Sequence, residues 1–230
     1  MIINLIIFVI DWRNEMYNLE REVQQKADYI KVARSMIEEC GFDDISIRKI
    51  ADKMGKNSAT LYKYFEGLDI LLLFASISYL KEYIEELLPS IRDIEEPKEK
   101  YLKVYEVFNK HSFNNPEIYF NLFYGPQSKH TKRVIEEYYI LFPEELGNEE
   151  ENEINLMLRQ GDIINRDTQL TKLFLVKGIF NKIEVNYLID IAVRVHSSYL
   201  YELIHKGADT EKSMKQFNVF LKDTIELLDK

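Results

Sequence analysis

Basic and small polar side chains are concentrated between residues 45 and 65 of the chain. Lysine and arginine neutralise the phosphates of a nucleic-acid backbone, and small polar side chains contact base edges. The segment contains a single aspartate and five cationic residues: Arg48, Lys49, Lys53, Lys56 and Lys63. Because the whole chain has a net charge of −9, this local excess of positive charge favours binding of a nucleic acid here.

The first of two short amphipathic helices predicted to position these side chains begins after Ser46. The Ser46 hydroxyl can accept a backbone N–H of the first helical turn, which makes this residue a good N-cap. The inward face of the helix is formed by Ile47, Ile50, Ala51 and Met54. Gly55 permits the left-handed backbone conformation that ends a helix, so we expect a tight turn at this residue.

The second helix is predicted from Ser58 to Phe65, with Asn57 as its N-cap. Leu61 and Phe65 are four residues apart and form the inward pair, which leaves a small, polar and cationic face outward. Two helices joined by a short glycine turn are the layout of a helix-turn-helix, whose second helix enters the major groove. Periodicity alone is equally compatible with two core helices that carry solvated lysines.

Residues at fourteen positions of this region form a more specific pattern: Ala33, Ile37, Gly41, Phe42, Ser46, Ile50, Ala51, Gly55, Thr60, Leu61, Tyr62, Tyr64, Phe65 and Leu71. With them, the segment from about residue 22 to 72 resembles the amino-terminal signature of the TetR family of bacterial transcriptional regulators. The run from Thr60 to Phe65 is the most specific part. The resemblance implies that the DNA-contacting positions are Arg48, Asn57, Ser58, Ala59, Thr60, Tyr62, Lys63 and Tyr64.

Three positions depart from the family pattern. Lys56 stands where a small apolar residue is usual and is expected to add a phosphate contact. Ala59 replaces a frequent glycine, and its methyl group could meet a thymine methyl. Leu68 replaces a lysine that usually approaches the phosphate backbone, so one expected contact is in doubt.

The resemblance and the helical periodicity together predict an all-α protein. We expect a three-helix DNA-binding head with the helix-turn-helix, followed by a larger helical ligand-binding and dimerisation body. The predicted boundaries are an amino-terminal extension at 1–21, the head at 22–66 and the body at 67–230. The apolar run 2–10 is interpreted as an extra segment packed on the protein or its partner, or as codons before a natural start at Met16.

Helices are expected from the spacing of apolar residues and from turn signals. The first, over residues 22–40, should bury Val23, Ala27, Ile30, Ala33, Ile37 and Cys40. Those of the body are predicted over 67–88, 98–110, 117–124, 128–142, 149–160, 168–181, 184–206 and 210–229. Pro89 is expected to end the first of these.

Two sets of body residues are assigned to sites. Aromatic density predicts a pocket for an apolar or aromatic effector, although core packing is the alternative for each residue: Tyr105, Phe108, Tyr119, Phe120, Phe123, Tyr138 and Phe174. The last two helices are predicted to form a hairpin that builds a four-helix dimer interface. Its residues are Leu188, Ala192, Val195, Tyr199, Leu203, Phe217, Leu221, Ile225 and Leu228.

No catalytic, cofactor or metal motif is found in the sequence. The four histidines, His111, His130, His196 and His205, have no metal-ligand spacing among themselves or with Cys40. Phosphate-binding glycine loops and nucleophile motifs are absent as well. A single cysteine excludes a disulfide framework and favours a cytoplasmic protein. We therefore expect no enzyme, no cofactor, no metal and no membrane span.

The sequence therefore predicts a homodimeric regulator that binds a palindromic operator in double-stranded DNA, most simply a repressor released by a small molecule. One alternative is a protein of the same fold that acts through a protein partner, which Leu68 favours. Another is a helical carrier of apolar ligands. The effector, the operator sequence, the regulated genes and the sign of regulation are not encoded in any motif.

Overall fold

The computed structural model describes residues 2–145 and 153–229, with the backbone alone for 2–15 and for Glu153. Within these ranges the secondary structure is helical, so the all-α fold class is confirmed. The chain divides into two compact units, Met1–Ala75 and Ser76–Lys230, which we call the amino-terminal and carboxy-terminal units. The division falls inside a helix that the sequence analysis assigned to the body as a whole.

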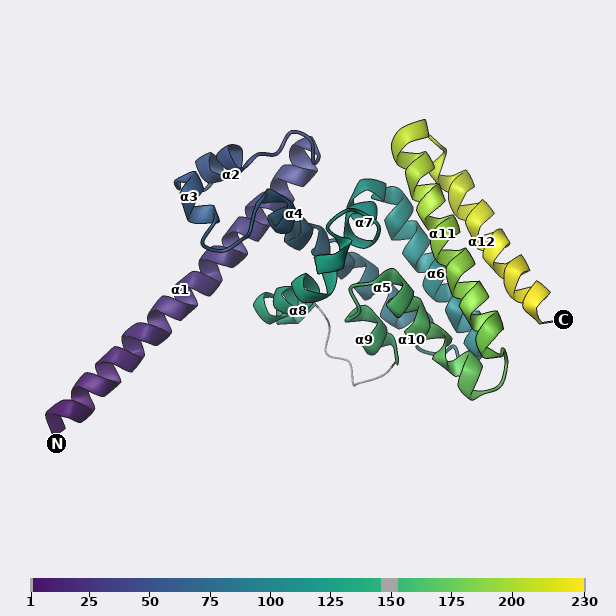
Figure 1. The fold of residues 1–230 in the computed structure, drawn as a ribbon, viewed down its shortest axis with the longest axis horizontal. Helices are drawn as coiled ribbons and strands as arrows, with labels where there is room; N and C mark the ends of the chain where they lie inside the picture. The colour runs from purple at the N-terminus through teal and green to yellow at the C-terminus, as the bar shows by residue number, and fades with distance from the viewer. Residues whose placement is uncertain (1, 146–152, 230) are drawn as a thin grey trace. The chain divides into compact units, whose positions relative to one another are not determined.

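The amino-terminal unit contains α1 (Ile2–Cys40), α2 (Ile47–Lys53), α3 (Ser58–Leu61) and most of α4 (Leu68–Ile77) (Figure 1). Helix α1 is continuous from Ile2 and is therefore longer than the predicted 22–40. The side chains of residues 2–10 lie outside the described residues, so their predicted packing stays a prediction. The exposed apolar side chains that follow in α1 include Met16, Tyr17 and Leu19.

The predicted buried stripe of α1 is confirmed at four positions and wrong at two. Ala27, Ile30, Ala33 and Ile37 are buried. Val23 is 44% exposed because it precedes the part of α1 that the other helices cover. Cys40 is exposed because it is the last residue of the helix, where its thiol donates a hydrogen bond to the Met36 carbonyl (3.2 Å).

An aromatic cluster joins α1 to the rest of this unit. The Phe65 ring packs edge to face against Tyr29 of α1 (6.2 Å between centroids) and against Phe74 of α4 (5.5 Å). The ammonium group of Lys26 lies 4.7 Å from the centre of the Phe74 ring. Such contacts each stabilise by about 0.5–1.5 kcal/mol beyond burial. The long helix is thus fixed against the residues that follow α3.

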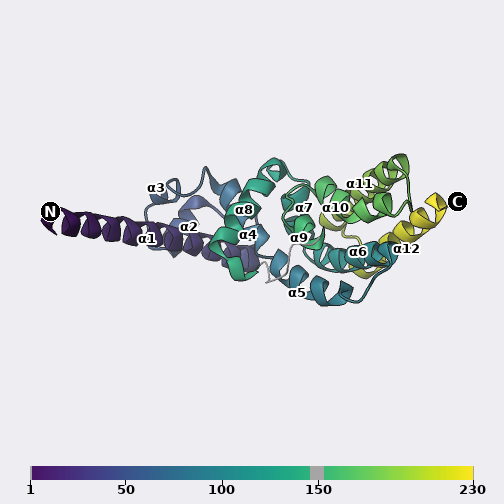
Figure 2. The same ribbon diagram turned by 90° about the horizontal axis from the view of Figure 1, so that it is seen from below.

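The carboxy-terminal unit is a helical assembly in which α6, α11 and α12 lie side by side (Figures 1 and 2). Its elements are α5 (Leu80–Ile91), α6 (Pro97–Asn114), α7 (Pro116–Phe123), the short 3₁₀ turns η1 (Ser128–His130) and η2 (Pro143–Glu145), α8 (Thr131–Leu141), α9 (Glu153–Leu158), α10 (Ile163–Val176), α11 (Lys182–Lys206) and α12 (Thr210–Leu228). Every predicted body helix has a counterpart, but several boundaries differ. Helix α6 continues to Asn114 instead of ending at 110, and α10 ends at Val176 instead of 181.

The predicted single helix 67–88 is wrong, because the chain turns after Ile77 and a new helix begins at Leu80. Turn-type hydrogen bonds join Tyr79 N to Ser76 O and Lys81 N to Ser78 O. Pro89 lies inside α5, which continues only to Ile91. Since proline removes one helical hydrogen bond, the helix ends within its next turn.

Helix α10 begins at Ile163, five residues before the predicted start. The Asp162 carboxylate accepts the backbone N–H of Asn165 (2.9 Å) and caps the helix, a signal that the sequence analysis did not use. The described part of the predicted helix 149–160 is α9, and residues 149–152 lie outside the described residues.

The core of the carboxy-terminal unit surrounds the buried imidazole of His196. Its ring stacks on Phe108 (4.9 Å) and Phe113 (5.1 Å). One ring nitrogen is hydrogen-bonded to the Ser112 hydroxyl (3.0 Å) and the other to the Tyr124 hydroxyl (2.9 Å). Burial lowers the pKa of His196 to about 3, so the imidazole is neutral and both nitrogens have partners.

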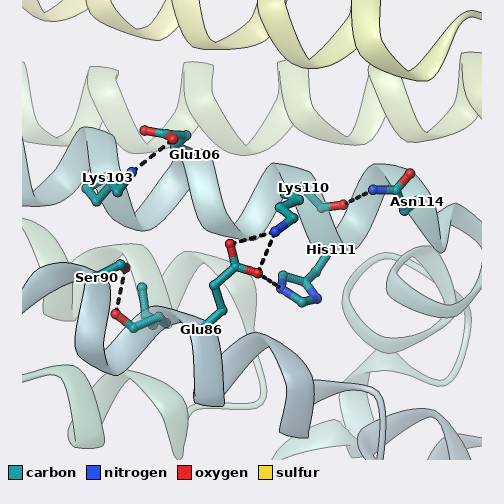
Figure 3. A network of polar contacts seen from close by, with 8 residues as sticks. Glu86, Ser90, Lys103, Glu106, Lys110, His111 and Asn114 are labelled. Carbon is teal, nitrogen blue, oxygen red and sulfur yellow. Dashed lines mark hydrogen bonds and ion pairs between the residues drawn. The ribbon is translucent and has the colours of Figure 1, made fainter.

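Polar contacts on the surface tie α5 to α6. The Glu86 carboxylate of α5 accepts hydrogen bonds from two side chains of α6, the Lys110 ammonium (2.8 Å) and a ring nitrogen of His111 (2.9 Å) (Figure 3). The hydrogen bond from Lys110 is the main cause that lowers the pKa of Glu86. A second pair, Lys103 with Glu106, lies along α6 itself (2.9 Å) (Figure 3).

Five of the nine residues predicted for the dimer interface are buried inside this unit: Leu188, Ala192, Phe217, Leu221 and Ile225. Their contacts come from the same chain, because α11 and α12 both pack against α6. Val195, Tyr199, Leu203 and Leu228 are partly exposed. The outer faces of the two helices carry other apolar side chains: Ile183, Tyr187, Tyr201, Val219 and Leu227.

Candidate functional site

Local capping signals build the helix pair at residues 46–65. The Ser46 hydroxyl accepts the backbone N–H of Lys49 (3.3 Å), and the Asn57 side chain accepts that of Ala59 (2.9 Å). Gly55 has a φ of 61°, the left-handed conformation that the sequence predicted for the turn. Both N-caps and the turn are therefore confirmed.

The second helix is shorter than predicted. Regular α-helical bonding ends at Leu61, and the residues up to Phe65 continue in tighter turns. Lys63 N bonds to Thr60 O (3.2 Å), and Phe65 N returns to Leu61 O (3.1 Å). The inward pair is nevertheless confirmed, since Leu61 and Phe65 are both buried.

Three cationic side chains of this helix pair are exposed and have no hydrogen-bond or ion-pair partner among the described residues: Arg48, Lys56 and Lys63. The other two are engaged. Lys53 is paired with Glu39 at the end of α1 (2.6 Å), and the Lys49 ammonium donates to the Asp44 carbonyl. The cationic side chains available for an external anion are thus the three that the sequence analysis assigned to DNA.

The remaining predicted contact residues differ in their accessibility. Asn57, Ala59 and Tyr62 are exposed, and Ser58 and Thr60 are partly exposed. Tyr64 is different, because its hydroxyl donates a 2.7 Å hydrogen bond to Gln25 of α1 and its ring lies 5.8 Å from that of Tyr29. The hydroxyl proton of Tyr64 is therefore used in a hydrogen bond to α1. Toward a group outside the protein, this hydroxyl can act only as a hydrogen-bond acceptor.

One cavity of the carboxy-terminal unit is small and partly polar. The space open to the centre of a water-sized sphere is about 20 Å³, enough for one such group. It lies between α5, α6, α9 and α10, and is lined by Tyr83, Val104, Tyr105, Phe108, Met157, Ile163, Arg166, Asp167 and Leu170. Both aromatic and charged groups therefore face the same space.

Only two of the seven residues predicted for an effector pocket, Tyr105 and Phe108, line this cavity. Phe123 does not line it, but the centre of its ring lies 4.7 Å from the guanidinium carbon of Arg166, which does. The other four contribute to packing elsewhere in the unit: Tyr119, Phe120, Tyr138 and Phe174.

Sequence reasoning missed Arg166 and Asp167, two buried charged residues of α10. Asp167 Oδ2 accepts hydrogen bonds from the hydroxyls of Tyr101 (3.1 Å) and Tyr105 (3.0 Å). Burial raises the pKa of Asp167 to about 7 although these two bonds act in the opposite direction. The helical spacing could have indicated that Asp167 is buried, because it lies on the inward face of α10 with Ile163, Thr171 and Phe174.

Two further features bear on the class of protein. Among residues 2–145 and 153–229, no group of three or more His, Cys, Asp or Glu side chains is arranged to hold a metal ion. In the same part of the chain, no helix is both long and apolar enough to cross a membrane.

Part of the chain matches a protein family, and the fold is similar to that of a solved structure. Residues 30–73 match the family described as bacterial regulatory proteins, tetR family, which covers α2, α3 and parts of α1 and α4. The fold is similar to that of a TetR-family transcriptional regulator from Syntrophomonas wolfei, with a TM-score of 0.57, 15% identity, and coverage of 90% of this chain and 96% of that one. A TetR-family regulator from Shewanella sp. PV-4 matches with a TM-score of 0.49, 13% identity, and coverage of 85% and 95%. Among curated proteins, the sequence has no significant match.

Proposed function

We propose, from the match of residues 30–73 to the TetR family of bacterial regulatory proteins, that this chain is a homodimeric repressor that a small-molecule effector releases from a palindromic operator. The observation that carries the DNA-binding part is the set of exposed, unpartnered cations on the helix pair, within the segment that matches the family. Arg48, Lys56 and Lys63 would bind phosphates and set the register on the duplex. Ala59, Thr60 and Tyr62 would lie nearest the base edges.

A dimer is supported by the apolar side chains on the outer face of α11. Ile183 and Tyr187 are four residues apart, and Tyr201 follows fourteen residues later, close to four helical turns. These residues are exposed and lie along one face of the helix. A second copy would bury this face, and two recognition helices about 34 Å apart would then meet successive major grooves of a palindrome.

Release by an effector is supported by the size and lining of the cavity. This cavity holds about one water-sized group, so a larger effector can enter it only in a more open conformation of the carboxy-terminal unit. A ligand that binds one conformation better than another shifts the population toward it. If that conformation separates the two recognition helices, the affinity for the operator falls. No catalytic step is required for this activity.

The test is retardation of the DNA upstream of the protein's own coding sequence, measured over a series of salt concentrations. The wild-type chain should retard this fragment in the presence of unrelated competitor DNA. Lys63→Ala should weaken binding to all DNA sequences and reduce the slope of log affinity against log salt by about one, because one phosphate contact is lost.

The matched control is Lys222→Ala, which removes an exposed lysine of α12 that lies 3.8 Å from Glu226. This variant should bind DNA as the wild type does. Equal affinity and equal salt slope for Lys63→Ala and the wild type would refute the assignment of Lys63. Failure of the wild-type chain to retard the fragment, together with effector binding, would instead favour a carrier or a protein-directed function.

A further inference from the structure

We propose that the effector carries a protonated amine, and that its ammonium group binds Asp167 among the rings of Tyr83, Tyr105 and Phe108. This inference rests on the proposed function, because it names the chemical class of the ligand that the carboxy-terminal unit recognises. It replaces the expectation of a purely apolar or aromatic effector. Four observations carry it.

The first is an unpartnered oxygen on a buried carboxylate. Asp167 is 2% exposed. Its Oδ2 accepts the hydroxyl protons of Tyr101 and Tyr105, whereas its Oδ1 has no hydrogen-bond partner among the described residues. Buried polar atoms are nearly always paired, and leaving one unpaired costs about 1–3 kcal/mol. The residue lines the cavity, so a ligand placed there can supply the missing donor.

The second observation is that no cation of the described chain neutralises this carboxylate. The adjacent Arg166 is directed elsewhere: its Nε donates to the Gln160 carbonyl and its Nη2 to the Leu158 carbonyl, both at 2.8 Å. Its guanidinium also lies over the Phe123 ring. Arg166 lines the same cavity as Asp167, but these contacts hold its guanidinium on backbone carbonyls and on a ring, and no ion pair joins it to Asp167 among the described residues. A buried carboxylate without a counter-ion favours a cationic ligand.

The third observation is the aromatic lining. Tyr83, Tyr105 and Phe108 are each at most 5% exposed and line the cavity with Asp167. The faces of aromatic rings carry negative potential and attract ammonium groups, by up to about 2 kcal/mol where water is excluded. A carboxylate together with several aromatic rings therefore selects a cation over a neutral group of equal size.

The fourth observation is the size of the space. About 20 Å³ accommodates one group of the size of a water molecule, which fits an ammonium head. The flexible thioether chain of Met157 lines the same cavity and can move to admit the substituent that follows the head. Apart from Arg166, whose guanidinium is held by backbone carbonyls, the rest of the lining is aliphatic, so this substituent should be apolar.

The test is isothermal titration calorimetry of the full chain with methylammonium, n-butylammonium and benzylammonium, each compared with methanol, 1-butanol and benzyl alcohol. At least one amine should bind ten-fold or more tightly than its matched alcohol. Asp167→Asn should remove this preference, because the amide keeps the shape of the side chain but carries no charge. Asp190→Asn, which changes an exposed carboxylate of α11, should leave it intact.

A second readout is the pH dependence of amine affinity. The titratable groups that face or neighbour Asp167 are Tyr101 and Tyr105 of α6, Tyr124, and Arg166 of α10. Burial raises the pKa of each of these tyrosines well above its usual value. Burial lowers the pKa of Arg166, whose ordinary value is far above neutrality. Asp167 is thus the member of this set that titrates between pH 5 and 8, and amine affinity should fall about ten-fold for each pH unit below 7.

The outcomes also distinguish this inference from the proposed function. Absence of a preference for amines over alcohols across the whole series would overturn it, and so would an unchanged preference in Asp167→Asn. Retardation of DNA by the same preparation would leave the repressor proposal standing in either case. Asp167-dependent amine binding by a protein that retards no DNA would support the site and refute the repressor.

Discussion

At the level of single residues, two buried titratable groups make the stability of this protein depend on pH in opposite directions. Burial lowers the pKa of His196 to about 3 and raises that of Asp167 to about 7. His196 must gain a proton on unfolding in acid, so its contribution to stability is lost as the pH falls from about 6.5 toward 3. The folded state retains the Asp167 proton, so the contribution of Asp167 is fully present below about pH 3.9 and is lost as the pH rises through 7.

The pH dependence assigned to Asp167 can be isolated by substitution. We expect the free energy of unfolding of the wild type, minus that of Asp167→Asn, to fall by about 1 kcal/mol per pH unit between pH 5 and 7. The His196 contribution is common to both proteins and cancels in this difference. The measurement is urea denaturation followed by circular dichroism at pH 5, 6, 7 and 8. A difference that is independent of pH would show that Asp167 is not buried as described, and Asp190→Asn serves as the exposed control.

At the level of elements, the loop between α9 and α10 is held by a close backbone contact with the first turn of α8. A Cβ atom added at Gly161 would lie 2.0 Å from the backbone nitrogen of Lys132 and 2.6 Å from the carbonyl carbon of Thr131. The neighbouring residue Gln160 supplies the carbonyl that accepts from Arg166. The same loop therefore positions one wall of the cavity.

We predict that Gly161→Ala destabilises the protein by about 1–3 kcal/mol or more, because two backbone segments must move apart. Thermal and urea unfolding of the variant would measure this loss. Gly67→Ala is the matched control: no atom lies within 4 Å of its added Cβ, and its φ is not positive. It should change stability by less than about 0.5 kcal/mol. Equal stabilities of the two variants would contradict the close approach at Gly161.

At the level of the whole molecule, the proposed function requires two copies of the chain. The outer face of α11, with Ile183, Tyr187 and Tyr201, is the surface on which we place the contact. Apolar side chains that water surrounds in one chain gain about 25 cal/mol for each Å² that a second chain covers. DNA affinity then depends on dimerisation, because both half-sites must be occupied at once.

Tyr187→Glu should therefore give a single chain of 27.4 kDa by light scattering, where the wild type should give twice this mass. A charge placed within an apolar interface loses its hydration without a partner. DNA retardation by the variant should weaken as well. Val176→Glu, at an exposed apolar position near the end of α10, should stay dimeric and bind DNA normally. A monomeric wild type at micromolar concentration would refute the dimer.

The features that could be predicted from residue types are those that depend on neighbouring residues. Ser46, Gly55 and Asn57 act on backbone groups no more than three positions away, so their roles as caps and turn could be predicted from residue types alone. The inward positions of Leu61 and Phe65 follow from helical spacing. The match to the TetR family lies in this same local pattern.

The cover of each apolar face and the surroundings of each buried charge depend on contacts between helices that are far apart in the chain. The stripe of Leu188 and Phe217 predicted burial correctly, but not that the same chain supplies the cover. Asp167 receives its two hydrogen bonds from tyrosines 66 and 62 residues earlier in the chain. No local pattern encodes such a contact, because it arises only when α6 and α10 pack against each other.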